Sequence, residues 1–128
     1  MEKRENIISK FIVDAAIEVH RTLGGPGLLE NVYEEALCWE LSNRGLRVER
    51  QLEVEIAYKG NRLASPLRLD LLVERLVIIE VKSVSVYNRI FEAQALTYLR
   101  LMNLRLALVI NFGEVKVGHA IHRVVNGL

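Results

Sequence analysis

The stretch that most constrains this chain is 67–83, LRLDLLVERLVIIEVKS, in which charged residues stand inside two apolar runs. Asp70 lies within the first run, and Glu80 and Lys82 close the second run in the pattern Glu-x-Lys. Burying a charged side chain is costly unless it is paired or holds a metal ion. Two acids and a lysine at the end of a core hairpin therefore indicate a functional site.

The near-continuous apolar character of this stretch predicts two central strands, covered on both faces and joined by a turn around Glu74 and Arg75. Residues directly opposite each other in an antiparallel pair share a face. A two-residue turn would place Asp70 opposite Ile79 and point Glu80 the other way. For the two acids to serve one site, we expect a loop with an odd number of residues, or a bulge.

The chain before this stretch is typical of two helices and a strand. Apolar residues recur every three or four positions over residues 4–23 and 28–43, which predicts helices with one apolar face. Between them, Gly24-Gly25-Pro26-Gly27 ends the first helix, because glycine terminates helices and proline cannot continue one. Residues 51–58 alternate between apolar and polar, which predicts a strand, and Lys59-Gly60-Asn61 predicts a turn.

The chain after the stretch is typical of one helix and two strands. Residues 89–102 have helical periodicity, whereas residues 104–112 and 115–125 have strand character on either side of a turn at Gly113-Glu114. The order of elements predicts an α/β fold with a central mixed β-sheet of about five strands flanked by helices. The helix between the third and fourth strands allows a right-handed parallel crossover.

Length and composition limit the class of protein. The 128 residues fit a single domain, 1–128, and a content of 51% hydrophobic and 26% charged residues supports a core and excludes disorder. A formal charge of +1 excludes a strongly basic DNA-coating protein, although it allows a local basic patch. The single Cys38 cannot form an internal disulfide, and no apolar run has the length of a membrane helix. We therefore expect a soluble, cytoplasmic protein without membrane contact.

The acids of the central stretch are suited to bind a divalent metal ion. Hydrolysis of a phosphodiester needs such an ion to neutralise charge and activate water. Mg²⁺ takes oxygen ligands, few of them from the protein. Asp70 and Glu80 can supply two carboxylates, and the Val81 carbonyl a third oxygen. Glu30, in the first turn of the second helix, can add another, although an acid there also complements the helix dipole.

Further residues complete the candidate site. Lys82 lies on the same strand face as Glu80 and can orient the attacking water or stabilise charge on the phosphate. Gln94, in the following helix, can hold water or a phosphate oxygen, and Tyr98 shares its helix face. Arg68 can touch phosphate or pair with an acid, and the sequence leaves both open. Arg68 and Tyr98 are thus the candidates for substrate contact.

The motifs together resemble a known group of nucleases. Asp70, Glu80-Val81-Lys82 and Gln94-x-x-x-Tyr98 are similar to the PD-(D/E)XK nuclease superfamily, and the glutamine–tyrosine pair is similar to that of the nuclease domain in bacterial recombination helicase–nucleases. Residues 27–33, GLLENVY, match the Gly-x-x-Glu-x-x-Tyr signature of the small bacterial proteins called the GxxExxY family. Asn111-Phe112-Gly113 is also similar to that family.

The resemblance covers about residues 8–124 and departs from the superfamily pattern at Leu69, where the superfamily name has proline. It implies a restriction-endonuclease-like core, Mg²⁺ or Mn²⁺ at Asp70 and Glu80, and a catalytic Lys82. By position, Glu30 is the matching acid of the helix before the sheet and Gln94 the matching residue of the helix after it.

Two functions follow from these observations. The first is a metal-dependent nuclease acting on DNA, alone, as a homodimer or with a partner protein. The second is a non-catalytic module that keeps the nuclease fold and binds nucleic acid or protein. The geometry of Asp70, Glu80 and Lys82 discriminates between them, because only the nuclease needs both carboxylates within reach of one metal ion and the lysine beside them.

Overall fold

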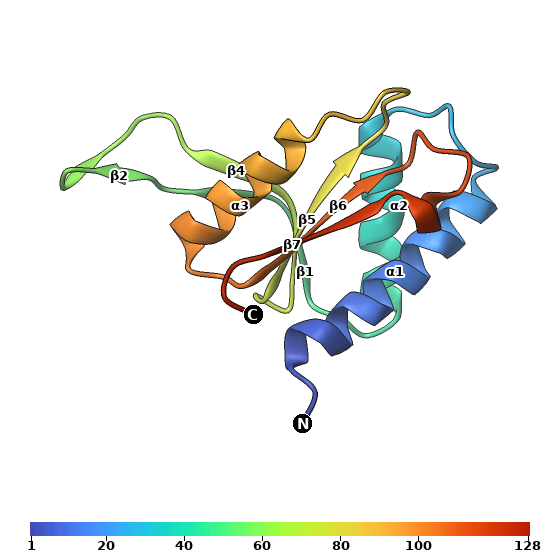
Figure 1. Cartoon of the computed structure of the whole chain (residues 1–128), viewed down its shortest axis with the longest axis horizontal. Helices are drawn as coiled ribbons and strands as arrows, with labels where there is room; N and C mark the ends of the chain where they lie inside the picture. Colours follow the sequence, from blue (N-terminus) through green and yellow to red (C-terminus); the bar gives the residue numbers. More distant parts are fainter.

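Five strands form one mixed sheet with helices on both faces, and the computed structural model describes all residues from 1 to 128 (Figure 1). The elements follow in the order α1 (Arg4–Thr22), α2 (Glu30–Asn43), β1 (Val48–Val54), β2 (Ala57–Tyr58), β3 (Asn61–Arg62), β4 (Leu67–Val73), β5 (Val77–Lys82), α3 (Ile90–Met102), β6 (Leu106–Asn111), the short 3₁₀ helix η1 (Val117–His119) and β7 (Ile121–Val125). None of the helices combines the length and the apolar character needed to cross a membrane.

The sheet has the strand order β1-β4-β5-β6-β7, and β5 and β6 are its one parallel pair. Parallel neighbours need a long crossover connection, which α3 supplies between these two strands. The predicted α/β class, the mixed sheet and the parallel crossover are therefore confirmed.

Two apolar cores lie on the two faces of the sheet. The larger core joins the inner sides of α1 and α2 to Ile79 and Val81 of β5. The smaller core joins the inner side of α3 to Ile78 of β5 and Val109 of β6. Figure 1 shows the corresponding separation, with α1 and α2 on one side of the strands and α3 on the other. The strand β5 is thus covered on both faces, as its apolar run predicted.

The loop between β4 and β5 has an odd number of residues. The last pairs before it are Leu71 with Ile79 and Val73 with Val77, which leaves three residues, 74–76, in the loop. Glu74 and Arg75 adopt left-handed backbone conformations, with φ of 53° and 57°, which close the chain tightly. The same register sets Asp70 level with Glu80, so the odd loop that a shared site requires is confirmed.

Two predicted strands are shorter than expected. The alternation over residues 51–58 spans two elements, because the sheet strand β1 ends at Val54 and the chain then leaves the sheet as the small β2–β3 hairpin. The prediction of a strand over residues 115–125 was also wrong in its first half. There Val117 and Ala120 are buried, and Val117 packs in the core beneath α1 from a 3₁₀ turn, so the apolar spacing is satisfied without a strand.

Candidate active site

Asp70 and Glu80 lie where β4 and β5 separate. Backbone pairing of the two strands ends at Leu71 and Ile79, one residue short of the two acids. Beyond that point the two carboxylates accept hydrogen bonds from backbone N–H groups of the opposite strand, in place of backbone–backbone pairs. The Asp70 N–H donates to Glu80 Oε2 at 3.0 Å, and the Val81 N–H donates to Asp70 Oδ2 at 2.8 Å. Each acid is thus held by the backbone of the opposite strand.

The two carboxyls bind protons more tightly than isolated acids do. Burial raises the pKa of Asp70 to about 6, against a lowering by the Val81 N–H, and the charge of Glu34 adds to the rise. Burial also raises the pKa of Glu80 to about 8, and the charge of Asp70 adds to it. Two adjacent carboxyls whose burial disfavours their charged forms make a site that a cation would stabilise.

Lys82 lies beside this pair on the same strand. Its side chain is half-buried, and its charge lowers the pKa of both Asp70 and Glu80. The Nζ atom lies 4.6 Å from the centre of the Phe91 ring, a cation–π distance. The aromatic ring of α3 therefore holds the lysine near the acids.

The oxygen donors fit a hard divalent ion that keeps most of its water. Asp70 and Glu80 offer two adjacent carboxylates, which is the protein share that Mg²⁺ commonly takes. No three His, Cys, Asp or Glu side chains are grouped so as to hold a metal by themselves, so the site does not form an all-protein cage. Val81 is fully buried and uses its N–H at this point.

The other predicted residues surround the pair at different distances. The carboxylate of Glu30 accepts a long hydrogen bond of 3.4 Å from the Ser83 N–H, one residue beyond Lys82, and its side chain is exposed. Gln94 is exposed on α3. Tyr98 is half-buried, and burial, followed by the charges of Glu80 and Asp70, raises its pKa.

Arg68, which the sequence left between phosphate contact and ion pairing, forms an ion pair with Glu53 of the neighbouring strand β1. Both side chains are more than half exposed, so the pair contributes little to stability. The Arg68 guanidinium, which lies on the same strand as Asp70, is therefore paired with a carboxylate. Any phosphate has to compete with Glu53 for it.

Two residues of the site, Glu34 and Gln51, were not identified from the sequence. Glu34 is 4% exposed on the inner side of α2, and its carboxylate accepts from Arg50 Nε at 2.6 Å and Gln51 Nε2 at 2.8 Å. The Gln51 Nε2 atom also lies 3.4 Å from Asp70 Oδ1. The sequence held a partial signal for Glu34, because it is spaced to share one helix face with Leu37 and Leu41, and none for Gln51.

Tyr33 holds the glycine-rich turn before α2, Gly24-Gly25-Pro26-Gly27. Its hydroxyl donates to the Gly25 carbonyl at 2.7 Å and accepts from the Leu28 N–H at 3.2 Å. The ring stacks on Phe112, with centroids 4.7 Å apart and an interplanar angle of 8°. The GLLENVY and NFG segments, which are far apart in sequence, therefore meet in the larger core.

Asn111 fixes the segment that follows Lys82. Its fully buried amide donates to the Val84 carbonyl and accepts from the Val84 N–H, both at 3.0 Å, as well as from the Gly113 N–H at 3.0 Å. A methyl group at Gly113 would lie 2.7 Å from the Val84 nitrogen and nearer still to the Val84 carbonyl oxygen. Only glycine lets the two loops approach this closely.

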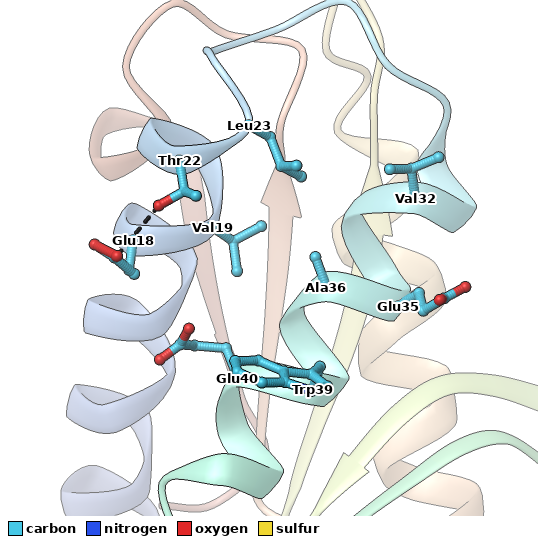
Figure 2. Close-up of a pocket in the computed structure, with 9 residues that line it drawn as sticks. All are labelled: Glu18, Val19, Thr22, Leu23, Val32, Glu35, Ala36, Trp39 and Glu40. Carbon is cyan, nitrogen blue, oxygen red and sulfur yellow. Dashed lines mark hydrogen bonds between the residues drawn. The ribbon is translucent and has the colours of Figure 1, made fainter.

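A cavity of about 730 Å³ lies away from these carboxylates, in a groove between α1 and α2. Figure 2 shows Val19, Leu23 and Ala36 lining it, with Trp39 across one end. A smaller cavity of about 380 Å³ borders the site, since Ser83 and Gly27 line it. None of the predicted site residues lines the larger groove, so cavity size alone does not locate the chemistry.

Comparison with known proteins gives one match that spans most of the chain. The family model described as the PD-(D/E)XK nuclease superfamily matches residues 6–124. This range includes both strands of the central hairpin and α3. Searches of the curated proteins and of the solved structures gave no match.

Proposed function

The chain belongs to the PD-(D/E)XK nuclease superfamily, and on this premise we propose that it is a Mg²⁺- or Mn²⁺-dependent nuclease that hydrolyses phosphodiester bonds of DNA. The observation that carries the proposal is the pair Asp70 and Glu80, two adjacent, largely buried carboxyls at the split of two core strands with Lys82 beside them. Such a pair is costly to bury without a cation. That need supports the metal dependence of the proposed reaction.

Each residue has a role that its position supports. Asp70 and Glu80 would hold the ion, with the Val81 carbonyl and Glu30 as further oxygen donors. The ion would neutralise phosphate charge and activate water. Lys82 would stabilise charge on the reacting phosphate, since it stands next to both acids. Tyr98 and Gln94 of α3 and Arg68 of β4 would contact the substrate strand.

The finer family assignment belongs to the same proposal. The GLLENVY and NFG segments support membership of the GxxExxY family, and their contact through Tyr33 and Phe112 gives the two motifs one structural purpose. We further propose that residues 1–128 act as a single nuclease domain in the cytoplasm, with DNA as partner and with a homodimer or a second protein supplying more binding surface.

The proposal is tested by metal binding and cleavage together. Calorimetry with Mn²⁺, and incubation with single-stranded, duplex and branched DNA, are carried out on the wild type and on Asp70→Asn. We expect binding and cleavage by the wild type and loss of both in Asp70→Asn. The matched control is Glu53→Gln, an exposed acid on the next strand, which should retain both. A wild type that neither binds Mn²⁺ nor cuts any of these substrates contradicts the proposal.

A second candidate is a non-catalytic module that keeps the fold and binds nucleic acid or protein. The engagement of Arg68 with Glu53 favours it, together with a formal charge of only +1, because both lower the attraction for a phosphate backbone. A protein that binds DNA equally well in Mn²⁺ and in EDTA, without cleavage, would support this module.

A further inference from the structure

We propose that Glu34 and Gln51 are positioning residues that fix the Asp70 carboxylate for the metal ion. This inference rests on the proposed function, because it assigns a role in metal binding. It concerns the link between α2 and β4 through the strand β1.

The first step is the position of Glu34. Its side chain is buried against the sheet, and each carboxylate oxygen has its own donor, Arg50 on one side and Gln51 on the other. A buried carboxylate with both oxygens engaged is held in one orientation. It can therefore act as a fixed anchor for the Gln51 amide.

The second step is the unusual backbone of Gln51. Its φ is 53°, a left-handed conformation that is rare for a residue other than glycine and foreign to a strand. The β1–β4 register pairs Arg50 with Leu71 and Leu52 with Leu69, and omits Gln51 and Asp70 between them. The strands are thus irregular at the one level where the amide turns toward Asp70, and strain of this kind concentrates at functional sites.

The third step is the effect on Asp70. The Gln51 amide lies 3.4 Å from Oδ1, while the Val81 N–H holds Oδ2 at 2.8 Å. Both carboxylate oxygens are thus positioned from the protein, one by β1 and one by β5. Partners that orient a metal-binding carboxylate tune its affinity for the ion.

Glu30 lacks these connections. It is exposed at the start of α2, and its one hydrogen bond is the long contact with the Ser83 N–H. Glu34 lies one helical turn further on and also raises the pKa of both Asp70 and Glu80 by its charge. Glu34 is therefore connected to Asp70 through Gln51, whereas Glu30 contacts the backbone after Lys82.

The test measures Mn²⁺ affinity by calorimetry at about pH 8, where protons compete less than at lower pH. Glu34→Gln keeps the shape of the side chain, and Gln51→Gly removes the amide while accepting the positive φ. We expect each to weaken Mn²⁺ binding about tenfold. The double variant should be about as weak as either single one, because both interrupt the same connection.

The matched control is Glu35→Gln, which removes an equal charge from the next position of α2, where the side chain is 77% exposed. It should bind Mn²⁺ like the wild type, which separates positioning from net charge. Thermal melting in EDTA reports folding, and if Glu34→Gln does not fold, Gln51→Gly alone decides, since Gln51 is exposed and its loss removes no core packing.

The outcomes are distinct. Folded variants that bind Mn²⁺ within about twofold of a binding wild type overturn this inference and leave the nuclease proposal standing. A double variant that binds Mn²⁺ about a hundredfold more weakly than the wild type also overturns this inference and leaves the nuclease proposal standing. Such a loss is the product of two independent effects, which add in free energy. A wild type that binds no Mn²⁺ overturns both.

Discussion

Asp70 and Glu80 are joined crosswise through the backbones of their strands. The N–H of Asp70 donates to the Glu80 carboxylate, and the N–H of the residue after Glu80 donates to the Asp70 carboxylate. This exchange keeps two like charges adjacent, since each gains a backbone donor as the strands separate. Burial raises the pKa of both groups, and the charge of Asp70 raises that of Glu80 further.

The first prediction concerns stability without metal. The pKa of Glu80 is raised from 4.5 to about 8, so the native state holds its proton more tightly than the unfolded state. Stability therefore falls as pH rises between these values. Glu80→Gln should remove this loss and, at about pH 8 in EDTA, raise the free energy of unfolding by at least about 1 kcal/mol. Urea unfolding at about pH 5 and about pH 8 measures it, and a variant with the same pH slope as the wild type contradicts it.

The second prediction concerns metal affinity. Protons compete with the ion for Glu80 below its pKa of about 8 and for Asp70 below about 6. The Kd for Mn²⁺ should therefore rise steadily as pH falls from about 8 to about 5, and each titration step should release protons. Calorimetry in two buffers of different ionisation enthalpy counts the protons. An affinity that is flat across this range would show that neither carboxyl binds the ion.

The third prediction concerns Lys82. Lys82→Met keeps the apolar stem near Phe91 and removes the charge beside the acids. We expect the cleavage rate to fall about 10²- to 10³-fold, because a group that stabilises transition-state charge is lost. Mn²⁺ affinity should be equal or higher, since a positive neighbour has gone. Lys116→Met, at an exposed position, is the control, and equal rates in the two variants would remove Lys82 from the reaction.

The fourth prediction concerns the loop contact at Gly113. Gly113→Ala places a methyl group against the backbone of Val84, where no flexible side chain can give way, and should lower the free energy of unfolding by about 2 kcal/mol or more. Gly118→Ala is the matched control. Its methyl group would meet Ile17 Cδ1 at an ordinary 3.8 Å and should change stability by less than about 0.5 kcal/mol. Chemical denaturation of both variants compares them directly.

Strand periodicity predicted much of the fold and the main feature of the site, which is the shared level of Asp70 and Glu80. Because a strand alternates with a period of two, the level of Asp70 and Glu80 depended only on the loop length, and the register confirms the odd loop. The apolar run of β5 also predicted cover on both faces. The alternation of residues 51–58 and 115–125 was less informative, since apolar spacing is equally satisfied by a hairpin outside the sheet or a 3₁₀ turn under a helix.

The side of α2 that faces the acids could not be assigned by position in the helix alone. Glu30 and Glu34 are one turn apart, and which of them reaches β4 depends on how the helix is rotated against the sheet. That rotation is set by Tyr33 and Leu37, which are fully buried, whereas Leu29 is 73% exposed. The left-handed Gln51 is a departure at a single residue, and no periodic pattern predicts it.

The three-residue loop 74–76 has a consequence for variation in length. Residues added within the loop can leave Val73 paired with Val77, so Asp70 stays level with Glu80 in a longer turn. A residue inserted between Val77 and Ile79 without a bulge moves the rest of β5 to the opposite face, so Ile79 would stand where Glu80 now does. Chains of this fold can therefore vary in the length of this turn, whereas a single insertion within β5 would separate the two acids.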